Sequence, residues 1–302
     1  MTDLATPASP ASPTGEAALG DEGAPAPATR KRRSLLDVTG PLLVFAAFLG
    51  AWNLLSYGLF PLLGLPDQKQ FLLPPPHEVV RESFTQWEPQ PNRGLAPLLS
   101  KLWISTQLAF VGLAIATGLG MVIGILMSQA RWIERSSWPY LVALQSIPIL
   151  AVAPLIGNVV NFDFGGKLIV TVVIALFPVV ANTLFGIKSV DRSLHELFDL
   201  HGTSRWTRLI KLELPIAAPA IFEGFRISAG LAVIGAVVGD LTMGEGEGGI
   251  GQLIQVYRQR LRNPEMIGAI VLAALLGLAF FWAFGFLKRR AVGHWYDAER
   301  PR

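Results

Sequence analysis

Uncharged apolar runs of about twenty residues recur along this chain, and they constrain its fold more than any other feature. The first run, "PLLVFAAFLGAWNLLSYGLF", occupies 41–60. A helix rises about 1.5 Å per residue, so about 20 residues cross a hydrocarbon core of roughly 30 Å. The sequence therefore predicts an all-α, polytopic membrane protein with six transmembrane helices. These helices are expected at 41–60, 102–127, 140–160, 168–187, 221–240 and 267–287.

The composition agrees with this class of protein. Hydrophobic residues make up 51% of the 302 residues and charged residues only 16%, whereas soluble domains average about 25% charged residues. The chain contains no cysteine, which excludes disulfides, thiolate metal sites and a cysteine nucleophile. Its net charge of +3 is not gathered on a basic face interleaved with aromatic residues, so we expect no nucleic-acid partner.

The distribution of positive charge predicts the orientation. With the N-terminus inside, the inner segments carry twice as many lysines and arginines as the outer segments. The positive-inside rule then places both termini in the cytoplasm and the chain in the cell inner membrane.

The chain is expected to divide into four segments. Residues 1–36 predict a disordered cytoplasmic tail, because they hold too few large apolar groups to offset their ordering entropy. A cleavable signal fits the first apolar run poorly, since the run is too long and no cleavage site follows. We assign the first transmembrane helix to 37–66, a five-helix transmembrane domain to 67–290 and a cytoplasmic tail to 291–302.

A polar, amphipathic stretch, "HELFDLHGTSRWTRLIKLELP" at 195–215, separates the fourth and fifth apolar runs. Its first part predicts a short helix with one apolar stripe, formed by Leu194, Leu197, Phe198 and His201. Gly202 then predicts a left-handed turn, and Thr203 or Ser204 caps a second helix. We expect Leu214-Pro215 to end that helix, because proline is disfavoured in a helix interior.

The same stretch resembles the EAA motif of ABC transporter permeases, in the nitrate/sulfonate/taurine branch. The resemblance rests on Glu196, on Gly202 six positions later, and on Leu212-x-Leu214-Pro215. It extends to "FLLPPPHEVV" and to "FRISAGLAVIGAVVGDLTMGEGEGGIGQLI". Leu197 and Phe198 replace the two alanines of the motif, and Asp240 stands where glutamate is expected.

The resemblance implies a cytoplasmic coupling loop, at about 191–215, that docks on a separate ATPase subunit. A generic pair of interfacial helices is the alternative that amphipathicity alone favours. The residues implied to couple this chain to the ATPase subunit are Glu196, Leu197, Phe198, His201, Gly202, Arg205, Trp206, Leu214 and Pro215.

The resemblance also implies the partners. They are two ATPase subunits, a second and identical permease, and a periplasmic or lipid-anchored solute-binding protein, all at a lipid membrane. ATP and Mg would belong to the ATPase, so this chain needs no cofactor or metal and is not itself an enzyme. The expected solute is a sulfonate-, nitrate- or taurine-like anion, an aromatic acid or a vitamin precursor.

Polar residues inside the apolar runs are candidates for a translocation path. Gln145, Asn158 and Asn182 lie in runs that prolines interrupt, although hydrogen bonding between helices explains them equally well. Asp240 is expected at the outer end of the fifth run, either as a solvated helix terminus or as a gate. The glycine-rich segment at 244–251 lacks the Gly-Lys-Ser/Thr of a phosphate loop, so we expect a flexible outer loop.

An ion-gradient-driven secondary transporter is the rival interpretation. Such a protein is expected to carry acidic or basic residues in mid-span and inverted repeats, and neither feature is evident in this sequence. A membrane-anchored scaffold, the third class, would not need polar spans interrupted by proline.

Overall fold

The computed structural model describes residues 35–59, 62, 73–85, 94–244 and 246–296, and within these ranges it contains helices and no strand. The chain divides into two units, Met1–Phe48 and Leu49–Arg302. The predicted tail at 1–36 lies almost entirely outside the described residues. Of the predicted tail at 291–302, residues up to 296 continue the last helix.

Five helices are long and apolar enough to cross a membrane as single spans. α1 (Leu35–Leu54) runs into the π-helical turn η1 (Leu55–Leu59). The other four spans belong to α5 (Leu95–Gln129), α8 (Phe164–Lys188), α11 (Leu214–Thr242) and α13 (Asn263–Tyr296). Their positions confirm five of the predicted transmembrane segments, although the helices extend beyond the apolar runs.

The predicted span at 140–160 is wrong as one straight helix. α6 (Arg131–Ser146) and α7 (Ile149–Val160) meet at an angle of 99°, and only together do they qualify as a sixth span. The cause is Pro148, because a residue that precedes proline avoids helical ψ. Ile147 accordingly adopts ψ 127° and interrupts the helix.

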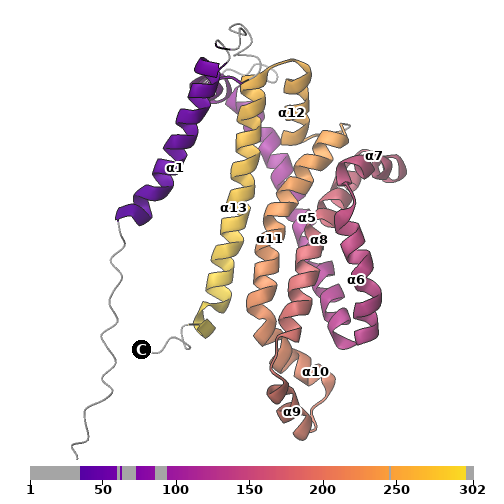
Figure 1. The fold of residues 1–302 in the computed structure, drawn as a ribbon. Helices are drawn as coiled ribbons and strands as arrows, with labels where there is room; N and C mark the ends of the chain where they lie inside the picture. The colour runs from indigo at the N-terminus through magenta and orange to yellow at the C-terminus, as the bar shows by residue number, and fades with distance from the viewer. Residues whose placement is uncertain (1–34, 60–61, 63–72, 86–93, 245, 297–302) are drawn as a thin grey trace, which may run out of the picture. The chain divides into compact units, whose positions relative to one another are not determined.

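α8 and α11 form the centre of the second unit, and α5 packs against α8 (Figure 1). Small residues bring these helices close together, as is common in membranes. Gly120 lies against Val179 and Gly124 against Thr183, at distances that leave no room for a Cβ atom. Glycine at these two positions therefore lets α5 and α8 approach closely.

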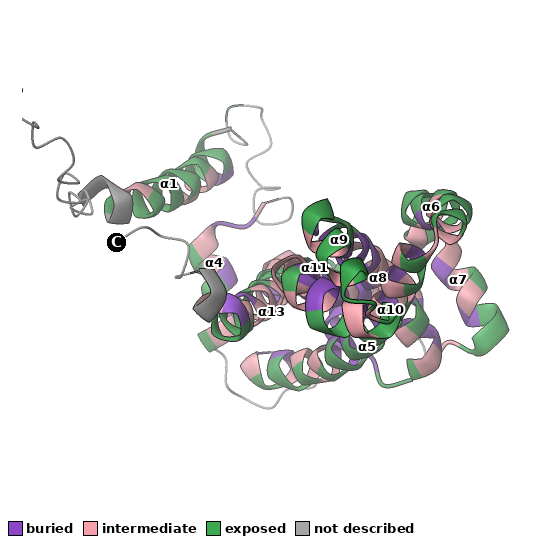
Figure 2. Ribbon diagram, turned by 90° about the horizontal axis from the view of Figure 1, so that it is seen from below, coloured by how far each residue is buried: buried purple, intermediate pink, exposed green. Residues whose placement is uncertain are grey.

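Short elements lie at both ends of this bundle (Figure 1). At one end are α4 (Pro76–Val80), η3 (Arg81–Thr85) and α12 (Ile250–Gln259). α12 buries Leu253 and Tyr257 against Leu98 and Ala269, and burial raises the pKa of the Tyr257 phenol to about 12. At the opposite end are α9 (Arg192–Leu200), α10 (Arg205–Arg208) and the π-helical turn η4 (Leu209–Glu213). Figure 2 shows α9 and α10 over the ends of α8 and α11.

Candidate functional site

The corner between α9 and α10 is built around Gly202. Its φ is +62°, a left-handed conformation that glycine adopts without the steric cost that a side chain imposes. The turn is closed by hydrogen bonds from the Gly202 amide to the Asp199 carbonyl and from the Thr203 amide to the Phe198 carbonyl, at 3.0 and 3.2 Å. A Cβ on Gly202 would meet nothing within 4 Å. Within this chain, glycine is therefore required by the backbone angle alone.

The second helix starts as predicted but does not end as predicted. The Ser204 hydroxyl accepts a hydrogen bond from the Thr207 amide at 3.2 Å and caps α10. Pro215, however, lies in the first turn of α11, and the chain stays helical from Arg205 to Thr242. The π-helical turn η4 allows this continuity, since the Leu214 amide donates to the Leu209 carbonyl five residues back. The element that follows the corner is thus continuous with a transmembrane helix.

A charged network that the sequence pattern does not predict ties α9 to η4. Arg208 pairs with Asp199 at 2.7 Å and with Glu213 at 3.3 Å, and the Glu213 side chain is only 8% exposed. His195 Nδ1 lies 3.9 Å from the same carboxylate. In the sequence, the only sign of this network is Glu213, an acidic residue between Leu212 and Leu214 where the helical pattern is otherwise apolar. The network holds the corner as one unit at the end of α11.

Most of the predicted coupling residues lie on the surface of this unit, where Figure 2 marks exposed residues in green. Trp206 is 73% exposed, Leu200 85% and Ile210 60%, which is unusual for large apolar side chains at a polar surface. Among the coupling residues that the sequence predicts, the exposed ones are Glu196, Leu197, His201, Gly202, Arg205 and Trp206.

The other predicted coupling residues are less accessible. Phe198, Leu214 and Pro215 are partly buried.

Two of the exposed residues have partners within the same segment. Glu196 pairs with Arg192 at 3.0 Å, one helical turn away. His201 Nδ1 lies 2.8 Å from the Leu197 carbonyl. The predicted stripe therefore exposes Leu197 and His201, while Phe198 faces inward.

The candidate path residues do not form one cluster. Gln145 and Asn158 are exposed on α6 and α7. Asn182 donates a hydrogen bond to the Pro178 carbonyl of its own helix at 2.8 Å. Asp240 lies on α11, and in the described part of the chain these four side chains share no hydrogen bond or ion pair with one another.

Asp240 is not the solvated terminus that one of our two interpretations expects. Its side chain is 1% exposed and pairs with Lys167 at 3.2 Å; the Lys167 side chain is itself 3% exposed. The Ser105 hydroxyl donates to the other carboxylate oxygen at 3.1 Å. Lys167, one residue before the predicted span at 168–187, lies in the first turn of α8. The ion pair and the Ser105 hydroxyl thus connect α8, α11 and α5 inside the bundle. Charges removed from water are costly unless they are paired and hydrogen-bonded in this way.

The glycine-rich segment is only partly a free loop. Residues 248–251 are buried, which contradicts the expected flexible loop for this half of the segment. The Ile250 amide donates to the Ser105 hydroxyl at 2.9 Å. A Cβ on Gly249 would overlap Ser105 and Asp240. Glycine thus lets the backbone that begins α12 approach the buried ion pair.

The predicted fifth run does contain two charged residues, but they lie near its inner end. Glu223 and Arg226 both lie on α11 within the predicted fifth run and are 3.6 Å apart. Lys288 of α13 pairs with Glu223 at 2.6 Å. Arg226 stacks on the Phe281 ring, with 4.0 Å from Cζ to the ring centroid. Glu223 and Arg226 lie within the first six residues of this run, so they are not the mid-span charges that a secondary transporter is expected to carry.

A family model described as "Binding-protein-dependent transport system inner membrane component" matches residues 116–293. The chain belongs to this family. It is 30% identical over 243 residues to the formylaminopyrimidine transport permease protein ThiX of Halalkalibacterium halodurans, a match that covers 80% of this chain and 90% of ThiX. The riboflavin transport system permease protein RibX of Chloroflexus aurantiacus is 36% identical over 162 residues, which are 54% of this chain and 60% of RibX.

The fold has also been seen in a solved structure. A chain of the MetNI methionine ABC transporter, in an inward-facing conformation, superposes with a TM-score of 0.58 at 19% identity. The match covers 65% of this chain and 96% of that chain. This match shows the multi-pass helical fold. The family model and the relatives named as permeases show that the chain is a permease subunit of the ABC importer class. Membership of this class implies ATPase and solute-binding partners.

Proposed function

We propose that this chain is the membrane-spanning subunit of an ATP-driven importer and that the α9–α10 corner couples it to a separate ATPase subunit. One observation carries the proposal: the corner, which exposes large apolar side chains, is joined through η4 without a break to α11. A movement of the docked ATPase would therefore act directly on a transmembrane helix.

The partners follow from the same arrangement. Two ATPase subunits would hold ATP and Mg²⁺, and two identical permease chains would enclose the path. A periplasmic or lipid-anchored binding protein would deliver the solute at the end of the bundle that carries α12. This arrangement requires both termini in the cytoplasm of an inner-membrane protein, in line with the excess of lysine and arginine in the inner segments.

The solute is proposed as a small organic or inorganic molecule. Several of the relatives are named for transport of formylaminopyrimidine, riboflavin, aliphatic sulfonates or nitrate. We infer a solute within this range: an anion of the sulfonate, nitrate or taurine kind, an aromatic acid or a vitamin precursor. Asn182 lies inside the bundle, and Gln145 and Asn158 on the broken pair, so these three remain candidates for contact with it.

The docking role is tested by removing one exposed side chain of the corner. Trp206→Ala should weaken co-purification of the full chain with its ABC ATPase by about 30-fold in affinity, since a central interface tryptophan commonly contributes 2 kcal/mol or more. Trp132→Ala is the matched control, because Trp132 is 71% exposed on α6 and lies outside the corner. Membrane insertion should be normal in both variants.

The same experiment distinguishes the proposed importer subunit from an ion-gradient-driven secondary transporter. A secondary transporter would purify without an ABC ATPase, and its uptake would collapse with a protonophore while ATP is still present. Equal ATPase binding by Trp206→Ala and Trp132→Ala would instead show that the corner is an interfacial anchor only.

A further inference from the structure

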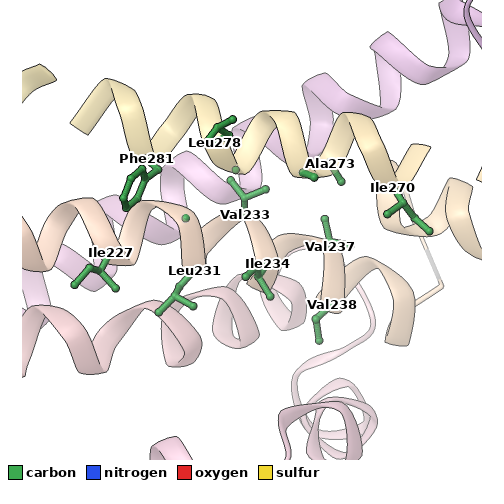
Figure 3. Close-up of a pocket in the computed structure, with 13 residues that line it drawn as sticks. Ile227, Leu231, Val233, Ile234, Val237, Val238, Ile270, Ala273, Leu278 and Phe281 are labelled. Carbon is green, nitrogen blue, oxygen red and sulfur yellow. The ribbon is translucent and has the colours of Figure 1, made fainter. Parts of the chain in front are cut away.

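An apolar groove runs between α11 and α13 in the second unit (Figure 3). Its volume is about 640 Å³, and its walls include Ile227, Ile234, Val237, Ala273 and Phe281. From Ile270 to Phe281 the groove follows α13 for about 16 Å at 1.5 Å per residue. One leaflet of a bilayer contributes about 15 Å of the hydrocarbon core. The groove therefore has the length of a single leaflet.

A second, polar cavity of about 300 Å³ adjoins the Phe281 end of the groove. It is lined by Arg226, Trp282, Gly285, Lys288 and Arg289. Arg226 connects the two spaces, because its guanidinium lies over the Phe281 ring that lines the groove. Gly285 leaves the room that this arginine occupies, since a Cβ there would lie 3.2 Å from Arg226 Nε.

The polar cavity carries an excess of positive charge. Arg226 and Lys288 share one carboxylate, that of Glu223, while Arg289 is exposed and forms no ion pair among the described residues. Arg226 Nε is buried without a hydrogen-bond acceptor. Three cations therefore line the cavity beside one anion, which leaves donors for charge-assisted hydrogen bonds to a further anionic group.

We propose that this combined site binds one anionic phospholipid of the cytoplasmic leaflet. The phosphate lies among Arg226, Lys288 and Arg289, and an acyl chain occupies the groove between α11 and α13. Trp282, 63% exposed, stands beside the headgroup, where tryptophan is enriched in membrane proteins. Basic pockets between transmembrane helices on the cytoplasmic side are suited to such headgroups.

The two halves of the site together favour a lipid over other occupants. A soluble anion would use the polar cavity and leave the groove empty. A second copy of the chain packed on the groove would cover the apolar walls but would not supply a phosphate. Only an amphiphile with an anionic head matches an apolar groove of leaflet length that ends in a cationic cavity.

The proposal is tested on the purified full-length chain by native mass spectrometry with dioleoyl phosphatidylglycerol and dioleoyl phosphatidylcholine as probes. The wild-type chain should bind phosphatidylglycerol more tightly. Arg289→Gln should weaken that binding about fivefold, as expected for one basic residue near an anionic headgroup. Arg290→Gln is the matched control, because Arg290 is the neighbouring exposed arginine outside the cavity.

The groove is tested separately with glycine variants. A Cβ on Gly230, which lines the groove, meets nothing within 4 Å. Gly230→Leu should therefore fold, occupy the groove and weaken binding of both lipids. Gly118→Leu on α5 is its control, since that position is also open.

Four outcomes would overturn the proposal. Equal affinity for the two lipids would show that the cations do not select the headgroup. Equal losses in Arg289→Gln and Arg290→Gln would reduce the effect to general surface attraction. Displacement of phosphatidylglycerol by millimolar inorganic phosphate would identify a soluble-anion site. A change of oligomeric state in Gly230→Leu, with lipid binding intact, would assign the groove to a second copy.

Discussion

The buried pair between Lys167 and Asp240 offers the sharpest test of how the outer end of the bundle is held together. Both side chains are almost fully enclosed, at 3% and 1% exposure. Asp240→Asn keeps the size of the side chain and an oxygen for the Ser105 hydroxyl, but it leaves the lysine charge buried without a counter-ion. Loss of one partner from a buried pair costs about 3–5 kcal/mol.

The double variant separates this cost from the value of the pair itself. Lys167→Met with Asp240→Asn removes both charges, and replacing a whole buried pair by neutral groups is often close to neutral. We therefore expect Asp240→Asn to lower the midpoint of thermal unfolding by on the order of 10 °C. The double variant should recover most of that loss.

The assay is thermal unfolding of the purified full chain in one detergent, followed by tryptophan fluorescence. Glu196→Gln is the control, because the Glu196–Arg192 pair is exposed and such pairs contribute at most about 1 kcal/mol. If Asp240→Asn lowers the midpoint no more than Glu196→Gln does, the two charges are not held in a water-free site. If the double variant is less stable than Asp240→Asn, the charges are not coupled.

Two further predictions concern the corner and the topology. Gly202→Val should insert normally but abolish uptake, since a β-branched residue is strained at φ +62°. Gly202→Asn should keep most uptake, because asparagine tolerates the left-handed region and the space around the Cβ is open. Wild-type uptake by the valine variant would show that the corner does not couple the chain to the ATPase subunit. A phosphatase reporter fused after Arg302 should be inactive and one inserted at Gly246, in the exposed part of the glycine-rich segment, should be active; the reverse pattern would overturn the orientation.

The sequence by itself determined the class of the protein and the place of its spans. A bilayer imposes one length on every crossing segment, so uncharged runs of that length can be read directly along the chain. The α9–α10 corner could also be predicted from the sequence, because a glycine between two amphipathic segments marks a local change of backbone angle. Gly202 at positive φ confirms that prediction.

Local patterns were less reliable where helices bend or continue. Pro148 broke the predicted third span, whereas Pro215 did not end a helix. The difference is in the surroundings of each proline. Ile147 turns to an extended conformation before Pro148, while the π-helical turn before Pro215 shifts the hydrogen-bond register and keeps the chain helical. Sequence alone does not distinguish these two responses.

Only the tertiary structure decided which charged residues are partners. From the sequence, Asp240 was either a solvated helix terminus or a gate, and no partner could be assigned to Lys167 or Glu213. Packing of α8 against α11 buries the first pair, and the turn at Gly202 brings Arg208 to Asp199 and Glu213. The burial of a charge depends on segments that are distant along the chain, because desolvation is a property of the packed helices and not of any one of them.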